Sequence, residues 1–306
     1  MANQVTVLGS LNVDTTLRIA RMPQPGETLS TENKSSAAGG KGANQAVAAA
    51  RAGAVTRFIG KVGNDEAGRF MVESLNNDGI DTSAIITDKT VGTGSAFILL
   101  DEEGQNSILV YGGSNQQIKP AEVTAVEAEI AKADFLITQF ETPQDVTLAA
   151  FTIAKQHGVT TILNPAPAAK IDPAILKVTD LVIPNETESA VLTGIEVTDV
   201  ASMDANAEKF RAMGVKNLII TVGSKGAYYN TAAASGFVPA FKVKAVDTTA
   251  AGDTFIGALS SQLKPDLSNI EAALTFAQRA SSLTVQGLGA MPSIPTLAQV
   301  EAANQA

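Results

Sequence analysis

The chain has 306 residues, of which 45% are hydrophobic and 17% are charged. This composition excludes a disordered or collagen-like chain, and the length suits one large α/β unit or two domains. The 31 acidic side chains outnumber the 22 basic ones, which argues against a duplex-binding protein, because such proteins neutralise phosphates with Lys and Arg. The absence of Cys and the single His exclude disulfides, Cys nucleophiles and multi-histidine metal sites.

Neither a membrane span nor a secretory signal is expected. No run approaches about 18 apolar residues, and the opening residues 1–9 are too short and polar for a signal h-region. We therefore expect a cytoplasmic protein that binds neither membrane nor nucleic acid.

Short β-branched runs alternate with helical patterns along most of the chain. Nearly continuous apolar strands of this length are typical of a parallel sheet that helices cover on both faces. Helices are indicated by apolar residues spaced three and four apart. The expected strands are residues 5–8, 58–62, 135–138, 160–163, 181–183 and 218–222. The expected helices begin at Lys41 and near Ala251 and also cover residues 66–77, 120–131, 143–156, 203–213 and 270–285.

Two segments interrupt this alternation. The first strand is separated from the helix at Lys41 by a long segment, whereas a βα loop usually has about 2 to 6 residues. Further along, the strand-like runs 96–100 and 107–111 flank a Gly-containing turn, as in a hairpin. We expect insertions at about 14–37 and 92–113 to pair into a small β-sheet. It would serve as a lid or dimer contact on a single domain of residues 1–306, because so few strands are marginal alone.

Polar residues follow four of the expected strands. Ligands of open α/β sheets bind beyond the carboxyl ends of the strands. A structural role is the alternative for each, because Asn, Asp and Gly are ordinary turn residues, but their recurrence at four strand ends favours a binding site. They are Ser10, Asn12 and Asp14; Gln139 and Glu141; Asn185 and Glu188; and Thr221, Gly223 and Gly226.

The glycine-rich string Ala38-Gly39-Gly40-Lys41-Gly42-Ala43-Asn44 opens a helix. Lys41 and Asn44, three apart, would project from one face of its first turn. This arrangement suits a polyhydroxy or anionic ligand at a helix N-terminus. The alternative is a plain strand-to-helix turn with Lys41 in solvent. The string matches neither G-x-x-x-x-G-K-[ST] nor G-x-G-x-x-G.

A second helix start lies in residues 247–255, Asp-Thr-Thr-Ala-Ala-Gly-Asp-Thr-Phe. The small residues Ala250, Ala251 and Gly252 would leave helix N-terminal amides exposed, and such amides stabilise developing negative charge. Asp253 is then a candidate acceptor for a hydroxyl proton, a role that suits the loose transition state of phosphoryl transfer. The alternative is an acidic residue that is simply favourable at a helix start.

Together these motifs resemble the ribokinase family of carbohydrate kinases over essentially the whole chain. The matching strings are residues 9–14, 39–46, 185–188 and 247–253. The resemblance implies a ribokinase-like three-layer α/β sandwich with a mostly parallel central sheet and a small β-sheet lid. It further implies ATP-dependent phosphorylation of D-ribose at O5, giving D-ribose 5-phosphate and ADP, by a homodimer that pairs through the lid.

The resemblance also implies roles for individual residues. Asp253 would be the catalytic base, and the amides of Ala250, Ala251, Gly252 and Asp253 would form an anion hole. Ribose would be held by Asn12, Asp14, Gly40, Lys41, Asn44, Glu141 and Asp253. ATP would contact Asn185, Thr221, Gly223, Ser224 and Gly226. Glu188 would help to organise Mg²⁺ through water, and K⁺ would be bound by Asp247, Thr249, Thr284, Gly289 and Ser293. The adenine contact stays unassigned, because the Asn that ribokinases often carry near Phe276 is absent here.

Three alternatives remain. Another kinase of the same family, for deoxyribose, fructose or a nucleoside, is less favoured because Asn12 and Asp14 are both polar and the G-G-K-G-A-N string is the ribokinase-like version. An inactive sugar-binding regulator would not require Asp253. A dinucleotide-dependent dehydrogenase would need a glycine fingerprint directly after the first strand, where the sequence reads Gly9-Ser10-Leu11-Asn12.

Overall fold

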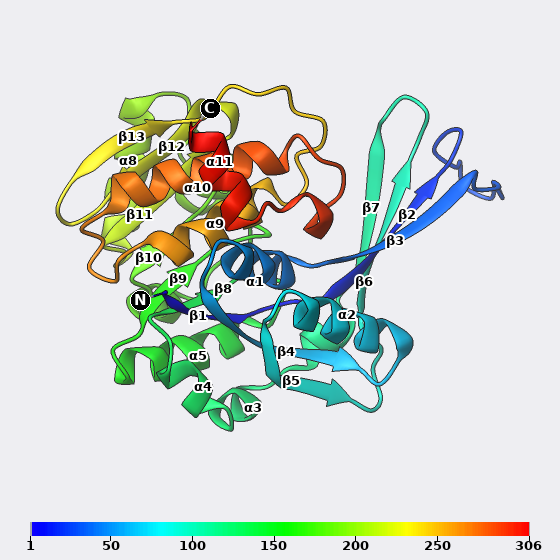
Figure 1. The fold of residues 1–306 in the computed structure, drawn as a ribbon, viewed down its shortest axis with the longest axis horizontal. Helices are drawn as coiled ribbons and strands as arrows, with labels where there is room; N and C mark the ends of the chain where they lie inside the picture. The colour runs from blue at the N-terminus through cyan, green and yellow to red at the C-terminus, as the bar shows by residue number, and fades with distance from the viewer. Residues whose placement is uncertain (1, 306) are drawn as a thin grey trace.

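The computed structural model describes residues 2–305, which fold around two β-sheets of very different size (Figure 1). Within these residues the larger sheet has nine strands. In spatial order they are β13 (Ser235–Pro239), β12 (Gly226–Asn230), β11 (Asn217–Val222), β10 (Leu181–Val182), β9 (Thr160–Leu163), β8 (Phe135–Thr138), β1 (Gln4–Leu8), β4 (Val55–Gly63) and β5 (Asp81–Asp88). All neighbouring pairs from β11 to β5 are parallel, and β12 and β13 add an antiparallel edge. The predicted mostly parallel sheet is confirmed.

Helices cover both faces of the larger sheet. Because successive side chains of a strand alternate in direction, Val5 and Val7 of β1 join one hydrophobic cluster and Leu8 joins the other. The first cluster involves α1 (Lys41–Arg51), α2 (Glu66–Asn77), α9 (Ala251–Gln262), α10 (Ile270–Thr284) and α11 (Leu297–Gln305). The second involves α3 (Pro120–Thr124), α4 (Glu127–Ala131), α5 (Gln144–Gln156), α6 (Pro173–Lys177), α7 (Glu186–Thr193) and α8 (Val200–Ala212). This is the expected three-layer sandwich.

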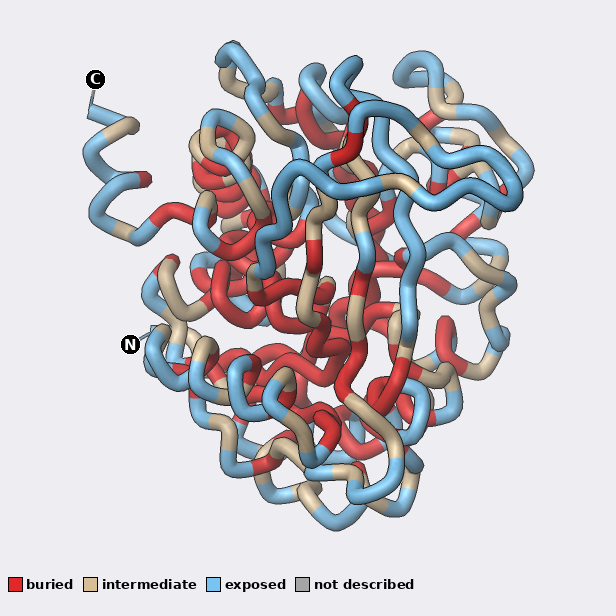
Figure 2. Tube along the Cα trace, turned by 90° about the vertical axis from the view of Figure 1, so that its right-hand side faces the viewer, coloured by how far each residue is buried: buried red, intermediate tan, exposed pale blue. Residues whose placement is uncertain are grey.

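The smaller sheet projects from one side of the larger one (Figure 1). It consists of β3 (Asn33–Gly39), β2 (Asn12–Arg18), β6 (Gly94–Leu100) and β7 (Asn106–Tyr111), in that order. β6 and β7 form the predicted hairpin. Every residue of β7 is exposed, as the pale blue colour of exposed residues shows in Figure 2, whereas β2 and β6 are mostly intermediate or buried.

Two predicted helices differ from the observed ones. The helix expected over residues 120–131 is divided into α3 and α4, because Val126 has a non-helical backbone (φ −112°, ψ 22°) and packs against the second cluster. The helix expected from residue 203 begins at Val200, because Asp199 accepts a hydrogen bond from the amide of Ser202 and caps it. Among residues 2–305 no helix has the length and apolar content that a membrane span needs.

Candidate active site

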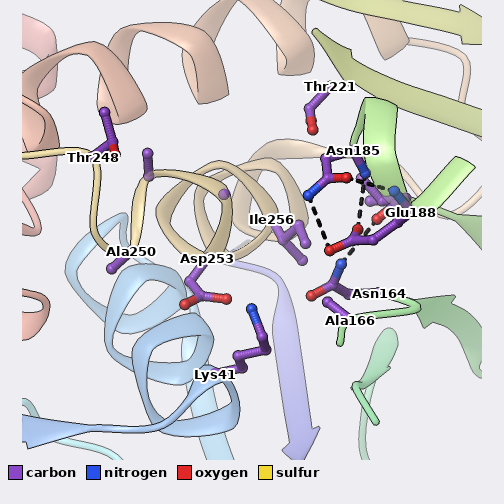
Figure 3. Close-up of a pocket in the computed structure, with 13 residues that line it drawn as sticks. Lys41, Asn164, Ala166, Asn185, Glu188, Thr221, Thr248, Ala250, Asp253 and Ile256 are labelled. Atoms are coloured by element: carbon purple, nitrogen blue, oxygen red, sulfur yellow. Dashed lines mark hydrogen bonds between the residues drawn. The ribbon is translucent and has the colours of Figure 1, made fainter. Parts of the chain in front are cut away.

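Two neighbouring cavities lie beyond the carboxyl ends of the central strands, where the sequence analysis expects the site. The smaller, of about 190 Å³, is lined by residues that include Lys41 and Asp253 (Figure 3). The larger, of about 420 Å³, is lined by residues that include Gly223 and Phe241. Gly252 lines both cavities. The N-terminus of α9 therefore forms the wall that the two cavities share.

The chain enters α9 through a residue in the left-handed region. Ala250 has φ 59° and ψ 9°, and the amide of Ala251 donates to the carbonyl of Thr248 at 3.2 Å. The amides of Gly252 and Asp253 have no backbone or side-chain acceptor in the described part of the chain. A Cβ atom added to Gly252 would meet no atom within 4 Å, so the space beside these donors is open. A helix start with free amides next to a cavity is suited to holding an anion.

The carboxylate of Asp253, which is 8% exposed, is held by two carboxamides of α1. Asn44 Nδ2 donates to its Oδ2 at 3.1 Å, and Gln45 Nε2 donates to its Oδ1 at 2.9 Å. Helices α1 and α9 approach closely at Gly257, where a Cβ atom would lie 2.4 Å from the carbonyl oxygen of Gln45. The close packing of these two helices therefore fixes the Asp253 carboxylate beside the free amides.

Asn44 keeps one polar atom without a partner. Its Oδ1 is buried and makes no hydrogen bond to any residue between 2 and 305. A buried acceptor without a donor is costly unless a ligand supplies one. The Oδ1 of Asn44, next to Asp253, is therefore suited to accept a hydrogen bond from a hydroxyl group of a ligand.

Three carboxylates act on the ammonium group of Lys41, which points toward Asp253 in Figure 3. Burial lowers the pKa of Lys41, but Asp253, Glu141 and Glu188 outweigh this effect, so its pKa is raised. Lys41 is therefore charged at neutral pH. Burial raises the pKa of Glu188 despite the opposing hydrogen bond from Asn185 and the charge of Lys41. The cluster has more negative than positive groups and is suited to bind a ligand together with a cation.

Asp14 lies on β2 of the smaller sheet and belongs to this cluster. Burial, together with the charges of Glu141 and Asp253, raises the pKa of Asp14 to about 7. Glu141 itself accepts hydrogen bonds at Oε2 from the hydroxyl of Ser10 at 2.5 Å and from the amide of Lys41 at 3.0 Å. The structure thus brings together residues from three predicted segments: Asp14 after the first strand, Glu141 after the strand of residues 135–138, and Lys41 from the glycine-rich string.

Asn12, at the start of β2, is held by a residue that the sequence analysis did not identify. Asn115 Nδ2 donates to Asn12 Oδ1 at 2.8 Å, and the Asn115 carboxamide also pairs with the backbone of Leu11 at 2.9 and 3.1 Å. A Cβ atom on Gly94 would lie 2.2 Å from Asn115 Nδ2. Because Asn12 Oδ1 is already paired, its Nδ2 is the group left to donate to a ligand.

Asn185 and Glu188 form a capping box at the start of α7 (Figure 3). Asn185 Oδ1 accepts from the amide of Glu188 at 2.8 Å, and Glu188 accepts from the Asn185 amide and Nδ2 at 2.9 and 3.0 Å. Asn185 also forms a bridge to Thr221 at the end of β11. Asn185 and Thr221 therefore line the smaller cavity from the ends of two adjacent strands, and Glu188 lines it from the first turn of α7.

The larger cavity is lined by all five predicted nucleotide-contacting residues: Asn185, Thr221, Gly223, Ser224 and Gly226. Gly223 and Ser224 follow β11, and Gly226 begins β12. Gly226 has φ 140°, and a Cβ atom there would lie 2.2 Å from the carbonyl oxygen of Val238, so only glycine fits. Phe241, whose ring lies 3.5 Å from Arg279 Cζ, and the buried Gln278 line the same cavity. Neither Phe241 nor Gln278 was predicted from the sequence to have a role in the site.

Asp247 connects two loops beside the start of α9. Its Oδ1 accepts from the amide and hydroxyl of Thr249 at 2.9 and 2.6 Å, and its Oδ2 accepts from the amide of Gly289 at 2.9 Å. Burial raises its pKa, but these hydrogen bonds outweigh burial and lower the pKa overall. Ser293 donates to the carbonyl of Ala290 at 2.8 Å. Asp247 is therefore a fixed anion at the base of the Ala250 turn.

One lining residue could have been identified from the sequence. Asn164 follows β9 directly, as the predicted polar residues follow their strands, and it lines the smaller cavity. By contrast, five of the residues predicted to hold ribose do not line that cavity: Asn12, Asp14, Gly40, Asn44 and Glu141. Asn44 nevertheless contacts Asp253 directly.

Comparison with known proteins shows the family to which the chain belongs. The pfkB family carbohydrate kinase description matches residues 2–297, and the chain belongs to this family. It is 48% identical over 301 residues to the ribokinase of Staphylococcus aureus, which covers 98% of this chain and 99% of that protein. It is therefore a carbohydrate kinase.

Two further relatives are informative. The chain is 51% identical over 294 residues to a bifunctional ribokinase/ribose-5-phosphate isomerase A of Fructilactobacillus sanfranciscensis, with 96% of this chain aligned. It spans only 54% of that longer protein. The structure of Arabidopsis thaliana ribokinase complexed with ribose and ATP superposes with a TM-score of 0.92 at 31% identity, covering 99% of this chain and 98% of that one.

Proposed function

We propose that this protein is a ribokinase, which transfers the γ-phosphoryl group of ATP to the 5-hydroxyl of D-ribose. The products are D-ribose 5-phosphate and ADP. One observation carries the proposal: the buried Asp253 carboxylate lies beside free helix amides on the wall that two cavities share. A sugar held beside Asp253 and a nucleotide in the larger cavity would meet at the N-terminus of α9. The names of the relatives support ribose and ATP as the substrates.

The reaction follows from the groups at this wall. The oxygen of the ribose 5-hydroxyl forms a bond to the γ-phosphorus while Asp253 accepts the hydroxyl proton. The bond between the γ-phosphorus and the β,γ-bridging oxygen breaks, and ADP leaves. The negative charge that develops is stabilised by the amides of Ala250, Ala251, Gly252 and Asp253. Because Ala251 already donates to Thr248, the amides of Gly252 and Asp253 contribute most.

Ribose is held on the side of the smaller sheet. Sugar hydroxyls are bound by Asn12 Nδ2 and Asn44 Oδ1, which have no hydrogen-bond partner among residues 2–305, together with Asp14, Gly40, Lys41 and Glu141. On the other side, Asn185, Thr221, Gly223, Ser224 and Gly226 contact ATP. A chain that kept this constellation only to bind sugar would not need a carboxylate next to free amides.

Mg²⁺ fits this site as a partner of the nucleotide. Residues 2–305 contain no group of three or more His, Cys, Asp or Glu side chains able to hold a metal ion, so Mg²⁺ would take most ligands from phosphate and water. Glu188 would hold those waters. When bound, Mg²⁺ neutralises phosphate charge that the acidic cluster would otherwise repel.

K⁺ is proposed as a second cation. Its ligands would be the Asp247 carboxylate, the carbonyls of Thr249, Thr284 and Gly289, and Ser293. The observation in favour is the fixed anion of Asp247 at the base of the Ala250 turn. K⁺ would order the loop that presents the free amides without touching either substrate.

The smaller sheet is proposed to act as a lid on a single domain of residues 1–306, and as the contact of a homodimer. Ile108, Leu109, Val110 and Tyr111 of β7 are between 53% and 64% exposed, an apolar edge that a second copy would cover. We propose that the enzyme acts in the cytoplasm, where ATP is supplied, with no nucleic acid or membrane partner.

A substrate panel tests the proposal. ADP release is measured with D-ribose, 2-deoxyribose, fructose and adenosine, each in the presence of ATP and Mg²⁺. We expect the highest kcat/KM for D-ribose, because 2-deoxyribose leaves buried polar groups unpaired at about 1–3 kcal/mol. A higher kcat/KM for any other acceptor would overturn ribose as the substrate. Sugar binding without ADP release would point to an inactive regulator.

A further inference from the structure

The side chain of Gln45 is fully buried and connects Asp253 to two central strands. Its Nε2 donates to Asp253 Oδ1 at 2.9 Å and to Asn164 Oδ1 at 3.1 Å. Its Oε1 accepts from Gln139 Nε2 at 2.6 Å. Gln139 directly follows β8 and Asn164 directly follows β9. Gln45 does not line the smaller cavity, so its contacts are with the protein.

The neighbours of Gln45 fix which way its carboxamide points. Asn164 Nδ2 donates to the carbonyl of Ile183 at 3.0 Å, which turns Asn164 Oδ1 toward Gln45. The Nε2 of Gln139 faces Gln45 Oε1. If the Gln45 carboxamide were reversed, its oxygen would face the oxygens of Asp253 and Asn164. Its NH₂ group would then face the NH₂ group of Gln139. Only the observed orientation satisfies all three contacts.

Gly9, the residue after β1, makes room for this arrangement. A Cβ atom on Gly9 would lie 2.3 Å from Gln139 Oε1. That oxygen is buried and has no hydrogen-bond partner among residues 2–305, so Gln139 is held mainly through its donor contact to Gln45. The network therefore depends on close packing of three strand ends against α1.

We propose that Gln45 is a positioning residue for phosphoryl transfer: it fixes the Asp253 carboxylate in the orientation that receives the hydroxyl proton, and Gln139 and Asn164 fix Gln45 in turn. The inference rests on the proposed function. Asn44, the other partner of Asp253, also has a free acceptor for the sugar, whereas all groups of Gln45 are used inside the protein. Each carboxylate oxygen keeps a lone pair for the substrate, because each receives one amide.

Two substitutions test the role of Gln45. Gln45→Leu removes both donors at similar volume, and kcat should fall by about 10² because misplacement of a reacting group has effects of that size. The KM for D-ribose should change less than about threefold, since Gln45 is fully buried and its polar groups bond only to protein side chains. Gln45→Glu keeps the shape but adds a negative charge next to Asp253. It should move the acidic limb of the kcat profile to higher pH, because like charges favour the protonated carboxyl.

Other titratable groups face Asp253 and stay unchanged in both variants. They are Lys41 on α1, Asp14 on β2 and Glu188 on α7. A difference between the pH profiles of Gln45→Leu and Gln45→Glu therefore reports the charge at position 45.

Asn206→Leu provides a matched control. Asn206 is an equally buried carboxamide that bonds Ser189 and Thr193 and contacts no residue of the proposed catalytic machinery. This variant should lower Tm but leave the pH limb unchanged. If Gln45→Leu does not fold, Gln139→Met, which removes only the donor that orients Gln45, should lower kcat by a smaller factor at unchanged KM.

Two results would overturn the inference. One is a Gln45→Leu kcat within about twofold of the native enzyme; the other is a Gln45→Glu pH limb that does not move. The proposed function fails separately: in that case the native enzyme itself would not phosphorylate D-ribose, whatever residue occupies position 45.

Discussion

The carboxylate of Asp14 on β2 occupies the position that a side chain of Gly39 on the neighbouring strand β3 would take. A Cβ atom on Gly39 would lie 2.0 Å from Oδ2 of Asp14. Residue 39 pairs with Asn12 in the register of β2 and β3, and Asp14 is two residues along the same strand. Asp14 can therefore reach the carboxylate cluster only if residue 39 has no side chain.

The first prediction concerns this contact. Gly39→Ala should displace the Asp14 carboxylate and raise the KM for D-ribose by about tenfold, because one hydrogen bond to a charged group contributes about 1.5–3 kcal/mol. The kcat should change less, since Asp253 is not touched. Steady-state kinetics measure both. Ser35→Ala on the exposed part of β3 is the control, and an unchanged KM in Gly39→Ala would contradict the prediction.

The second prediction concerns pH and stability. Burial and the charges of Glu141 and Asp253 raise the pKa of Asp14 from its ordinary value of 3.8 to about 7 in the folded protein. A raised carboxyl pKa means that the folded state holds the proton more tightly. The stabilisation of the folded state by the proton on Asp14 is therefore complete below about pH 4 and is lost as the pH rises to about 7. Asp14→Asn should match the native Tm at pH 4 and exceed it at pH 8.

Asp65 supplies a control of opposite sign for the Asp14 measurement. Its hydrogen bonds from Thr93 and Gly68 lower its pKa despite burial. Asp65→Asn should therefore lower Tm more at pH 8 than at low pH. A Tm difference for Asp14→Asn that does not vary with pH would show that Asp14 ionises normally.

The third prediction separates turnover from binding at Asp253. Asp253→Asn should lower kcat by about 10²–10⁴, the usual effect of removing an acid–base residue. The affinity for D-ribose, measured by calorimetry, should change only modestly. Asp145→Asn, which alters a first-turn acid of α5 that lines neither cavity, should leave both unchanged. Equal losses of turnover and affinity would indicate a structural role for Asp253.

The fourth prediction concerns the monovalent cation. Replacing K⁺ by Na⁺ should lower kcat/KM, because the Ala250 turn would lose an ordering ligand. Asp247→Asn replaces one accepting oxygen by an NH₂ group and should weaken activation by K⁺, seen as a higher half-saturating concentration in a titration of ADP release. Activity that is the same in K⁺, in Na⁺ and without either ion would refute this site.

The fifth prediction concerns assembly. Leu109 pairs with Phe97 on the face of the smaller sheet opposite Asp14, and the two are 64% and 42% exposed. Leu109→Glu should convert the proposed homodimer to a monomer in sedimentation velocity experiments, because burying a charge there without a partner is costly. Lys34→Glu on the exposed part of β3 is a surface-charge control. A native protein that sediments as a monomer would exclude the proposed homodimer.

The sequence predicted local features well. Helix α2 begins and ends where its apolar spacing indicates, and the strands β8 and β9 have the predicted bounds. The hairpin of β6 and β7 followed from its central turn. The start of α8 could also have been predicted, because Asp is a preferred N-cap residue and Asp199 directly precedes the helix. Local rules suffice here because the residues that form each element are neighbours in the chain.

The sequence by itself determined the class of fold, the strand ends that carry polar residues, and Asp253 as the candidate base. Only the tertiary structure decided how those groups meet. Asn44 and Gln45 are more than two hundred residues from Asp253 in sequence, as their hydrogen bonds to it record. No periodicity in the sequence indicates that α1 contacts α9, or that a side chain at position 39 would collide with Asp14. Such contacts arise from the packing of distant elements, which depends on side-chain volume and close approach rather than on local spacing.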